Sequence, residues 1–262
     1  MKRFAVIGNP IVHSLSPCMH RANFLALGIE ASYELKQVLN LEKEMKDLKQ
    51  LDGFNVTLPY KQMIIPFLDD VDPIAKAIGA VNTVKNVNGK LMGYNTDVDG
   101  FFESFQGLNV KLDASILILG AGGAARAVYF ALIKNGYQNI TIANRTLDKA
   151  KDICDNSISL VQAGEQLESY QCIINTTSVG LIEGQCPIDL KNLNSNHVVM
   201  DLIYKPKLTT LLKRAKELNC RYEFGLDMLL IQGAKAFEIW FNQEANRTMM
   251  KQQLEVELYV NR

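Results

Sequence analysis

The sequence predicts an α/β protein built from two α/β domains, and three observations lead to this prediction. Short apolar, β-rich runs alternate with helical patterns along almost the entire chain, which is typical of largely parallel sheets covered by helices. A length of 262 residues, at roughly 150 residues per domain, corresponds to one large or two modest domains. The pattern is interrupted near residue 100, and a new series of strands and helices starts after it. We therefore expect a domain boundary near that residue.

The composition excludes several classes of protein. Lys and Arg together number 28, as do Asp and Glu, so the net charge is zero, which argues against a surface for nucleic acid. The five cysteines are scattered without a Cys-x-x-Cys pair, so we expect neither a disulfide framework nor a metal site, and a reducing, cytoplasmic compartment fits best. No apolar run approaches the roughly 20 residues that span a bilayer, so we expect neither secretion nor membrane insertion.

The first half of the chain predicts a βαβαβ pattern followed by a hairpin. Ser16 and Pro17 mark a helix start, because Ser is a good N-cap and Pro suits the first helical position. Pro59 suits the start of a further helix. Asn88-Gly89 is the dipeptide that a two-residue type I′ turn prefers. The expected strands cover residues 4–7, 33–38 and 53–56, the helices residues 16–28 and 41–51, and the hairpin residues 82–95.

From residue 115 a second series of strands and helices starts. Its expected strands cover residues 116–119, 140–143, 172–175 and 198–202, and its helices residues 124–134 and 208–218. Two helical patterns, at 228–244 and 247–259, close the chain, and we expect at least one of them to pack on the first domain. The predicted domains are residues 1–100 together with a C-terminal helix at about 240–262, and residues 101–239.

A glycine-rich turn predicts a dinucleotide site in the second domain. The strand at 116–119 leads directly into Gly120-Ala121-Gly122-Gly123-Ala124-Ala125, and a helix follows, which matches the Gly-x-Gly-x-x-Gly/Ala signature in its strand-turn-helix setting. Small residues let the backbone turn tightly and approach a pyrophosphate, whose charge then lies at the helix N-terminus. A tight turn that binds nothing is the structural alternative.

The end of the next strand predicts NADP rather than NAD. It continues into Asn144-Arg145-Thr146, with Lys149 one turn on, where an NAD-binding domain carries Asp or Glu for the ribose hydroxyl. A guanidinium pairs with a 2′-phosphate through charge-assisted hydrogen bonds, whereas a carboxylate repels it. The alternative for Arg145 is a solvated surface charge.

Polar residues at strand ends in the first domain predict a ligand site there. Ser14 and Ser16 follow the first strand, at the carboxyl edge where open α/β sheets bind ligands, although Ser16 suits a helix cap equally well. Lys61 falls in the first turn of the helix expected from Pro59, where the helix dipole disfavours a cation and so favours proton transfer. An exposed lysine without a role is the structural alternative.

Further polar residues surround the expected hairpin and interrupt the last apolar stripe. Asn82 and Asp97 bracket the hairpin, and Asp97 also suits the N-cap of a helix at about 98–105. Gln232 lies within an apolar helical stripe, and a buried amide needs either backbone partners or a polar ligand. His13 and His20 have no partner that indicates a triad or a metal site, and we interpret them as structural.

Together these motifs resemble the ordered motif set of shikimate dehydrogenases. The similarity covers essentially the whole chain, and the number, order and spacing of the motifs make the assignment specific. The motifs are SLSP at 14–17, NVTLPYK at 55–61, NT at 82–83, GYNTD at 93–97, GAGGAA at 120–125, NRT at 144–146, NTTS at 175–178, DLIYKP at 201–206 and GLDMLLIQ at 225–232.

The resemblance implies a fold and an activity. It implies a substrate-binding domain, a Rossmann-type NADP-binding domain and an active-site cleft between them. The implied activity is the reversible, NADP-dependent reduction of 3-dehydroshikimate to shikimate, on the path to chorismate and the aromatic amino acids. The partners would be this small-molecule substrate, neither nucleic acid nor a membrane, and the protein would be a monomer or homodimer.

The resemblance also implies roles for individual residues. Lys61 and Asp97 would be the acid-base pair, with Lys61 protonating the alkoxide that hydride transfer forms. The substrate-binding residues would be Ser14, Ser16, Thr57, Lys61, Asn82, Asp97, Tyr204 and Gln232. The NADP site would be lined by Gly120, Ala121, Gly122, Gly123, Ala124, Asn144, Arg145, Thr146, Lys149, Leu202 and Gly225.

Two positions depart mildly from the family pattern, and two alternatives stay open. Leu202 stands where many relatives have Met, and Asp227 replaces the glycine before Met228. One alternative is a quinate/shikimate dehydrogenase of broader specificity. The other is a catalytically silent, NADP-binding regulatory protein on the same fold. The presence of both Lys61 and Asp97 argues against the silent protein.

Overall fold

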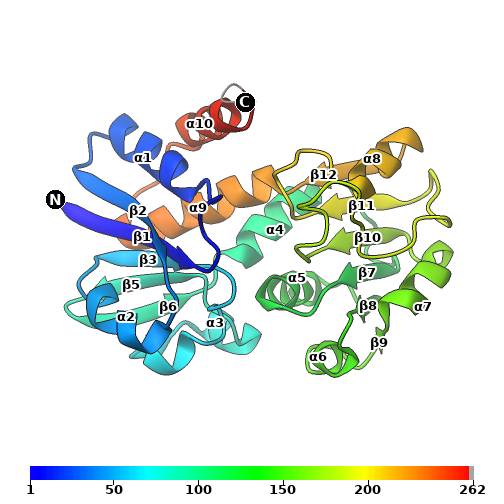
Figure 1. Ribbon diagram of the computed structural model, residues 1–262, viewed down its shortest axis with the longest axis horizontal. Coiled ribbons are helices and arrows are strands. Elements are labelled where there is room, and N and C mark those ends of the chain that lie inside the picture. The colour runs from blue at the N-terminus through cyan, green and yellow to red at the C-terminus, as the bar shows by residue number, and fades with distance from the viewer. Residues whose placement is uncertain (260–262) are drawn as a thin grey trace. The chain divides into compact units, whose positions relative to one another are not determined.

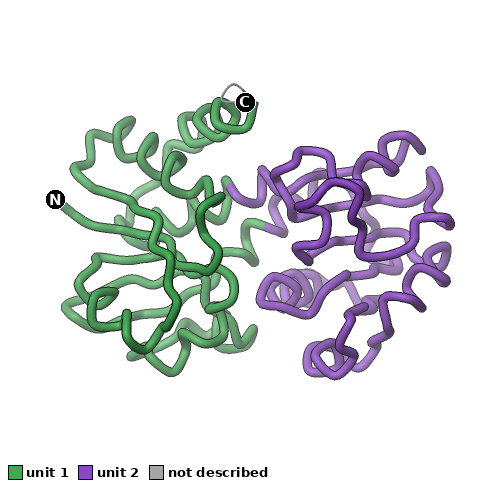
Figure 2. The backbone as a smooth tube through the Cα atoms, viewed as in Figure 1, with its two compact units in different colours: residues 1–100, 230–262 green, residues 101–229 purple. Residues whose placement is uncertain are grey.

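The computed structural model describes residues 1–259, which form two compact units (Figures 1 and 2). Unit 1 contains Met1–Gly100 and the chain from Leu230 onward, and unit 2 contains Phe101–Leu229. Each unit has its own six-stranded sheet with helices, so the predicted α/β class is confirmed. The last three residues of the segment expected at 240–262 lie outside the described residues. Within residues 1–259, no helix combines the length and the apolar character needed to cross a membrane.

The sheet of unit 1 mixes parallel and antiparallel pairs. Its strand order is β2-β1-β3-β5-β6-β4, in which β1 runs parallel to β2 and β3, whereas β5 runs antiparallel to β3 and β6. The strands are β1 (Lys2–Gly8), β2 (Ala31–Gln37), β3 (Gly53–Val56), β4 (Asp70–Val71), β5 (Thr83–Val87) and β6 (Lys90–Tyr94). The helices are α1 (Ser16–Ala26), α2 (Leu41–Leu48), α3 (Pro73–Ile78) and α10 (Arg247–Tyr259), together with the first residues of α4 (Asp97–Gln106) and most of α9 (Leu226–Phe241).

Alternate residues of β1 supply two separate cores. Phe4 and Val6 pack with side chains of α1 and α9, whereas Ala5 and Ile7 pack with side chains of α2 and of the segment after β3. This alternation follows from the two-residue period of a strand. Both faces of the sheet are therefore covered, and the helices α1 and α10 lie side by side in Figure 1 and in contact.

The predicted hairpin is confirmed, and it anchors the end of α9. Asn88 and Gly89 have φ values of 54° and 85°, as a type I′ turn requires. The indole Nε1 of Trp240 donates to the carbonyl of Val84 at 2.9 Å, and Nζ of Lys85 donates to the carbonyl of Ile239 at 2.6 Å. These contacts hold the end of α9 against β5.

The anchoring of α9 explains where the chain passes from unit 2 back into unit 1. The change falls at Leu229–Leu230, inside a continuous helix, rather than near residue 240 as the sequence pattern indicated. Ala236, Phe237 and Trp240 belong to the core beside Phe4, so this part of the helix packs with unit 1.

The sheet of unit 2 is entirely parallel, and the strands expected at 116–119, 140–143 and 172–175 are confirmed. Its order is β12-β11-β10-β7-β8-β9, so the chain reverses its direction across the sheet between β7 and β10. The strands are β7 (Ile116–Leu119), β8 (Ile140–Ala143), β9 (Ser157–Ile158), β10 (Cys172–Asn175), β11 (Val198–Asp201) and β12 (Arg221–Phe224). The helices are α5 (Gly123–Lys134), α6 (Leu147–Lys151), α7 (Leu160–Glu165) and α8 (Thr210–Glu217).

Two expectations about helix starts in unit 1 are wrong. Ser16 is the first residue of α1 and not its cap, since the cap position is Leu15 and no side chain bonds there. No α-helix starts at Pro59, where the chain makes consecutive turns that lead into a short 3₁₀ helix at Ile65–Phe67. The carbonyl of Lys61 accepts the N–H of Val81 at 2.7 Å, so a long-range contact uses the group that would continue a helix.

His20 of α1 is a structural residue in the core of unit 1. Its ring is fully buried and stacks on Tyr33, with the ring centroids 4.5 Å apart and the planes at 12°. Neither ring nitrogen has a hydrogen-bond partner among the described residues. Burial lowers the pKa of His20 to about 3, so the imidazole is neutral at physiological pH.

We expect His20 to make unit 1 less stable in acid. In the unfolded chain a histidine binds a proton below about pH 6.5, whereas folded His20 stays neutral until about pH 3. The unfolded state therefore binds more protons across this range, and stability falls as the pH is lowered through it. The free energy of unfolding should lose about 3 kcal/mol between pH 7 and pH 4 from this group.

Urea titrations of the wild type and of His20→Phe test this expectation. The fluorescence of Trp240, the single tryptophan, reports on unit 1 because its ring lies 5.3 Å from that of His20. The variant should lose less stability in acid than the wild type, while His13→Phe, a change at an exposed histidine, should keep the wild-type pH dependence. Equal pH dependence in wild type and His20→Phe would contradict the assignment.

Candidate functional site

Three of the polar residues singled out in the sequence form one cluster in unit 1. Nζ of Lys61 lies 2.6 Å from Oδ2 of Asp97, and Nδ2 of Asn82 donates to Oδ1 of Asp97 at 2.8 Å. The side chains of Lys61 and Asp97 are only 15% and 6% exposed. A largely buried ammonium–carboxylate pair of this kind is held in place much more firmly than an ion pair on the surface.

The backbone places Lys61 without the help of a helix. The N–H of Thr57 donates to the carbonyl of Ile7 at 2.9 Å, and the N–H of Val81 donates to the carbonyl of Lys61 at 2.7 Å. Both bonds join segments that are far apart in the sequence. No helix dipole from Pro59 therefore acts on the Lys61 ammonium. Its charge is paired with the carboxylate of Asp97 instead.

The carboxamide of Asn82 can point in only one direction. Its Oδ1 accepts the N–H of Thr96 at 2.8 Å and the hydroxyl of Thr83 at 2.9 Å. Its NH₂ group is thereby turned toward Asp97 and toward Oγ1 of Thr96, 3.0 Å away. Asp97 is the first residue of α4 rather than a cap, and its N–H is bound by the side chain of Asn95 at 3.1 Å.

Gln232 joins the same cluster from α9. Its Oε1 lies 3.5 Å from Nδ2 of Asn82, so the amide that interrupts the apolar stripe faces a polar neighbour. It lies eight residues before Trp240, whose indole holds this helix against β5. Gln232 is half-buried, and this neighbour is a side chain rather than the backbone groups or the ligand that the sequence suggested.

The other residues expected in the substrate site lie in three places. Ser14 and Ser16 are adjacent, with their hydroxyl oxygens 3.3 Å apart, just past β1. Thr57 follows β3 and packs over Gly8, where an added Cβ would come within 2.6 Å of its methyl group. Tyr204 belongs to unit 2, after β11, and its role stays a prediction.

In unit 2, the residues expected to bind NADP gather at the carboxyl edge of the parallel sheet. Gly120 follows β7, Asn144 follows β8, Leu202 follows β11 and Gly225 follows β12. In an open α/β sheet, ligands bind at this edge where the direction of the chain reverses, which here is between β7 and β10.

The glycine-rich turn leaves the start of α5 open. Gly120 has a φ of +110°, and an added Cβ would lie 2.6 Å from Oγ1 of Thr176. Gly122 is the N-cap of α5, no side chain caps this helix, and an added Cβ at Gly122 would meet no atom within 4 Å. A helix N-terminus with unused N–H groups and free space above it fits a pyrophosphate.

The segment after β8 fits a 2′-phosphate. Arg145 and Lys149 are both exposed, and neither forms an ion pair in the described part of the chain. Nδ2 of Asn144 donates to the carbonyl of Thr146 at 2.8 Å and so shapes the turn that carries Arg145. Two unpaired cations at this edge of the sheet suit a phosphate group, and their contact with a 2′-phosphate stays a prediction.

Several buried polar residues support the two sites although the sequence motifs that contain them gave them no role of their own. In unit 1, Asn55 of β3 donates to Oγ1 of Thr83 at 3.0 Å. In unit 2, Asp201 accepts from Asn175, Thr209 and the N–H of Ile203. Burial raises the pKa of Asp201, and these three hydrogen bonds oppose that rise. The sequence feature that could have identified them is an Asn or Asp within, or at the end of, an otherwise apolar strand.

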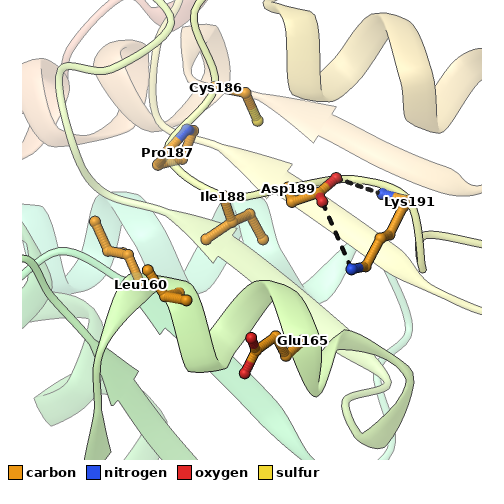
Figure 3. A pocket seen from close by; sticks show the side chains of 8 residues that line it. Leu160, Glu165, Cys186, Pro187, Ile188, Asp189 and Lys191 are labelled. Atoms are coloured by element: carbon orange, nitrogen blue, oxygen red, sulfur yellow. Dashed lines mark hydrogen bonds and ion pairs between the residues drawn. The ribbon is translucent and has the colours of Figure 1, made fainter.

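One hollow on unit 2 holds none of the expected site residues. It has a volume of about 450 Å³ and is drawn in Figure 3. Its charged pair, Asp189 and Lys191, is internally satisfied, because the Asp189 carboxylate accepts the backbone N–H of Lys191 and pairs with its Nζ at 3.9 Å. The lining is formed by Leu160, Val161, Glu165, Cys186, Pro187, Ile188, Asp189 and Lys191.

The chemistry available in unit 1 is proton transfer. Among residues 1–259, no group of three or more His, Cys, Asp or Glu side chains is arranged to hold a metal ion. The Lys61 ammonium is a proton donor, Asp97 holds it, and Asn82 holds Asp97. This arrangement suits a reaction in which negative charge develops on an oxygen beside Lys61.

Comparisons with known proteins place the whole chain in one family. The family model for the shikimate dehydrogenase substrate binding domain matches residues 6–84, that for shikimate / quinate 5-dehydrogenase residues 104–182, and that for the shikimate 5′-dehydrogenase C-terminal domain residues 225–255. A shikimate dehydrogenase (NADP⁺) of Nitrosopumilus maritimus is 43% identical over 97% of this chain and 98% of its own.

Two solved structures are similar along nearly the whole chain. Shikimate 5-dehydrogenase of Thermus thermophilus in complex with NADP(H) and shikimate has a TM-score of 0.88 at 37% identity, covering 97% of this chain and 98% of its own. Quinate dehydrogenase of Corynebacterium glutamicum in complex with NAD has a TM-score of 0.88 at 29% identity, covering 97% and 98%.

Proposed function

Since this chain belongs to the shikimate dehydrogenase family, we propose that it catalyses the reversible, NADP-dependent reduction of 3-dehydroshikimate to shikimate. The observation that carries the proposal is the buried pair of Lys61 and Asp97 with Asn82 bound to it. A regulatory protein that only binds NADP has no use for this arrangement. The reaction belongs to the route that leads to chorismate and the aromatic amino acids.

Lys61 is the proposed acid. When bound, NADPH supplies the hydride that reduces the ketone carbon. Nζ of Lys61 donates a proton to the ketone oxygen as negative charge develops there, and accepts it again in the reverse direction. Asp97, 2.6 Å away, keeps the ammonium in place, and Asn82 keeps the carboxylate from rotating. Positioning of this kind avoids reorganisation during the reaction.

The remaining polar residues of unit 1 are proposed to hold the substrate. The adjacent hydroxyls of Ser14 and Ser16 suit its carboxylate, since a carboxylate accepts two hydrogen bonds side by side. Thr57 and Gln232 offer groups for its hydroxyls, and Asn82 lies beside them with its own carboxamide bound by Thr83, Thr96 and Asp97. The proximity of Gln232 to Asn82 supports a common site for these residues.

The carboxyl edge of the sheet in unit 2 is proposed to hold NADP. The open space at Gly122 and the uncapped start of α5 suit the pyrophosphate, and Arg145 with Lys149 suits the 2′-phosphate. Leu202 and Gly225 line the same edge, after β11 and β12. All five cysteines are unpaired thiols, which supports a reducing compartment such as the cytoplasm for this enzyme.

Oxidation of quinate is the second candidate activity. It is favoured by the similarity to a quinate dehydrogenase, although at 29% identity against 37% for the shikimate-bound structure. The quinate dehydrogenase was solved with NAD, whereas Arg145 here favours a 2′-phosphate. Arg145 therefore speaks against a preference for NAD but not against quinate, and turnover of quinate is what separates the two activities.

An absorbance assay at 340 nm tests the proposed function directly. Purified protein is mixed with shikimate or quinate, each with NADP or NAD. We expect fast NADPH formation with shikimate and NADP, and much slower reactions in the other three mixtures. Equal rates with quinate would establish the broader enzyme, and no reaction in any mixture, from protein that binds NADP, would favour the silent regulatory protein.

Removing the proposed acid should slow the chemical step. Lys61→Ala should lower kcat by about 10²- to 10⁴-fold with little change in the KM for shikimate, as expected when a proton-transfer group is lost. Lys90→Ala, at an exposed lysine of the hairpin, is the control and should leave both constants unchanged. A large rise in KM at an unchanged kcat would instead make Lys61 a binding residue.

Reversing the charge at Arg145 should weaken NADP selectively. Arg145→Asp should reduce NADP affinity by about 1.5 to 3 kcal/mol, the scale of a charged hydrogen bond, without weakening NAD. Calorimetric titration with both cofactors measures the difference. Lys111→Asp makes the same change at another exposed cation of unit 2 and should leave NADP binding as it is. Unchanged NADP binding in Arg145→Asp would remove this residue from the site.

A further inference from the structure

Tyr33 of β2 lies fully buried at the end of the hydrogen-bond chain that leads to Asp97. Its hydroxyl donates to Oδ1 of Asn55 at 2.6 Å, and its ring stacks on neutral His20. Tyr33 is part of none of the motifs through which the site was found in the sequence. It nevertheless supplies the donor for the side-chain oxygen of Asn55.

The amide of Asn55 has a fixed orientation. Its Nδ2 donates to the carbonyl of Asn82 at 3.2 Å and to Oγ1 of Thr83 at 3.0 Å. A carbonyl oxygen can only accept, so the NH₂ group must face it, and Oδ1 must face Tyr33. The phenol is thus the donor that this buried oxygen needs.

The orientation is passed on through Thr83. Because Oγ1 of Thr83 accepts from Asn55, its own proton is available for Oδ1 of Asn82, 2.9 Å away. With this oxygen occupied, the NH₂ group of Asn82 faces Oδ1 of Asp97 at 2.8 Å. The side chains of Asn55, Asn82 and Thr83 are all buried, so no bulk solvent competes for these groups.

We propose that Tyr33 is a positioning residue: by donating to Asn55 it reinforces, through Thr83, the orientation in which Asn82 holds Asp97 beside Lys61. The N–H of Thr96 favours the same orientation. The proposal rests on the function proposed above, since the pair that Tyr33 orients is the proposed acid and its partner. Tyr33 itself touches neither Lys61 nor the reacting atoms and is not a catalytic residue.

A second contact of Tyr33 defines the rival explanation. The side chain of Ser16 bonds to the phenol and lowers its pKa, while burial raises that pKa well above its usual value by a larger amount. The phenol therefore stays protonated and keeps its proton for Asn55. If Tyr33 acted only through Ser16, its loss would affect substrate binding and not the proton-transfer step.

The test compares Tyr33→Phe, Thr83→Val and the double variant. Tyr33→Phe should lower kcat for shikimate oxidation about tenfold, the equivalent of one hydrogen bond, with less than a threefold change in KM. Thr83→Val removes the hydroxyl through which Tyr33 acts, so the double variant should be no slower than Thr83→Val alone.

Tyr137→Phe is the matched control. The hydroxyl of this buried tyrosine of unit 2 donates to the backbone carbonyl of Val110 at 3.0 Å. This control should lose similar thermal stability without a change in kcat.

Three kinetic results would overturn the proposal. These are a kcat of Tyr33→Phe within twofold of the wild type, fold-losses that multiply in the double variant, and a rise in KM alone, which would show that Tyr33 acts through Ser16. A further readout needs no enzymatic activity. It is the NMR exchange rate of the side-chain amide protons of Asn82, whose signals are assigned by their absence in Asn82→Ser. This exchange rate should rise at least tenfold in Tyr33→Phe. An unchanged exchange rate would overturn the proposal, whether or not the wild type is active. An inactive wild type would by itself refute only the proposed function.

Discussion

The carboxamide of Asn82 is the group on which the polar cluster of unit 1 depends. It has one oxygen and two N–H donors, and each is used: the oxygen by Thr83 and Thr96, and the NH₂ group by Asp97 and Thr96. A buried polar group left unpaired costs about 1–3 kcal/mol, so an alternative orientation that opposes acceptor to acceptor is strongly disfavoured. The carboxylate of Asp97 therefore has one position, and Lys61 takes its own position from that carboxylate.

The register of the hairpin brings these residues together. Thr83 of β5 pairs with Tyr94 of β6 on one side and with Asn55 of β3 on the other. The type I′ turn at Asn88-Gly89 sets the first of these pairings, and a slip by one residue would send every side chain to the opposite face. Asn82 lies directly before β5, and Asp97 lies three residues after Tyr94, which pairs with Thr83. The two-residue turn therefore determines where Asp97, the partner of the proposed acid Lys61, lies.

The sequence predicted those parts of the fold that depend on local pattern. The strands at 116–119, 140–143 and 172–175, the helix at 247–259 and the hairpin follow from apolar periodicity and from one dipeptide. The helix expected at Pro59 failed because a bond from Val81 to Lys61, twenty residues apart, competes with it. The same limit applies to Ser16, which has the residue type of a cap but faces Ser14 and Tyr33 instead.

Long-range hydrogen bonds also explain which site residues the sequence revealed. Lys61, Asn82 and Asp97 stood out because they lie just outside strands, where polar residues are conspicuous: Lys61 after β3, Asn82 before β5 and Asp97 after β6. Tyr33 and Asn55 lie inside strands, where the residue type alone does not indicate a hydrogen-bond partner. Their importance depends on the partners across the sheet, Asn55 opposite Thr83, which only the strand order defines.

The glycines of unit 2 show how a motif residue can be small for different reasons. Gly120 has a positive φ and lies against Thr176, and a Cβ at Gly225 would lie 2.0 Å from the carbonyl oxygen of Leu202. In both cases the protein itself leaves no room for a side chain, so these glycines would be required with or without a ligand. Gly122 is different, because its φ of −92° suits any residue and nothing lies within 4 Å of an added Cβ. The fold does not account for a glycine there, whereas a pyrophosphate in close contact with the backbone at the start of α5 does.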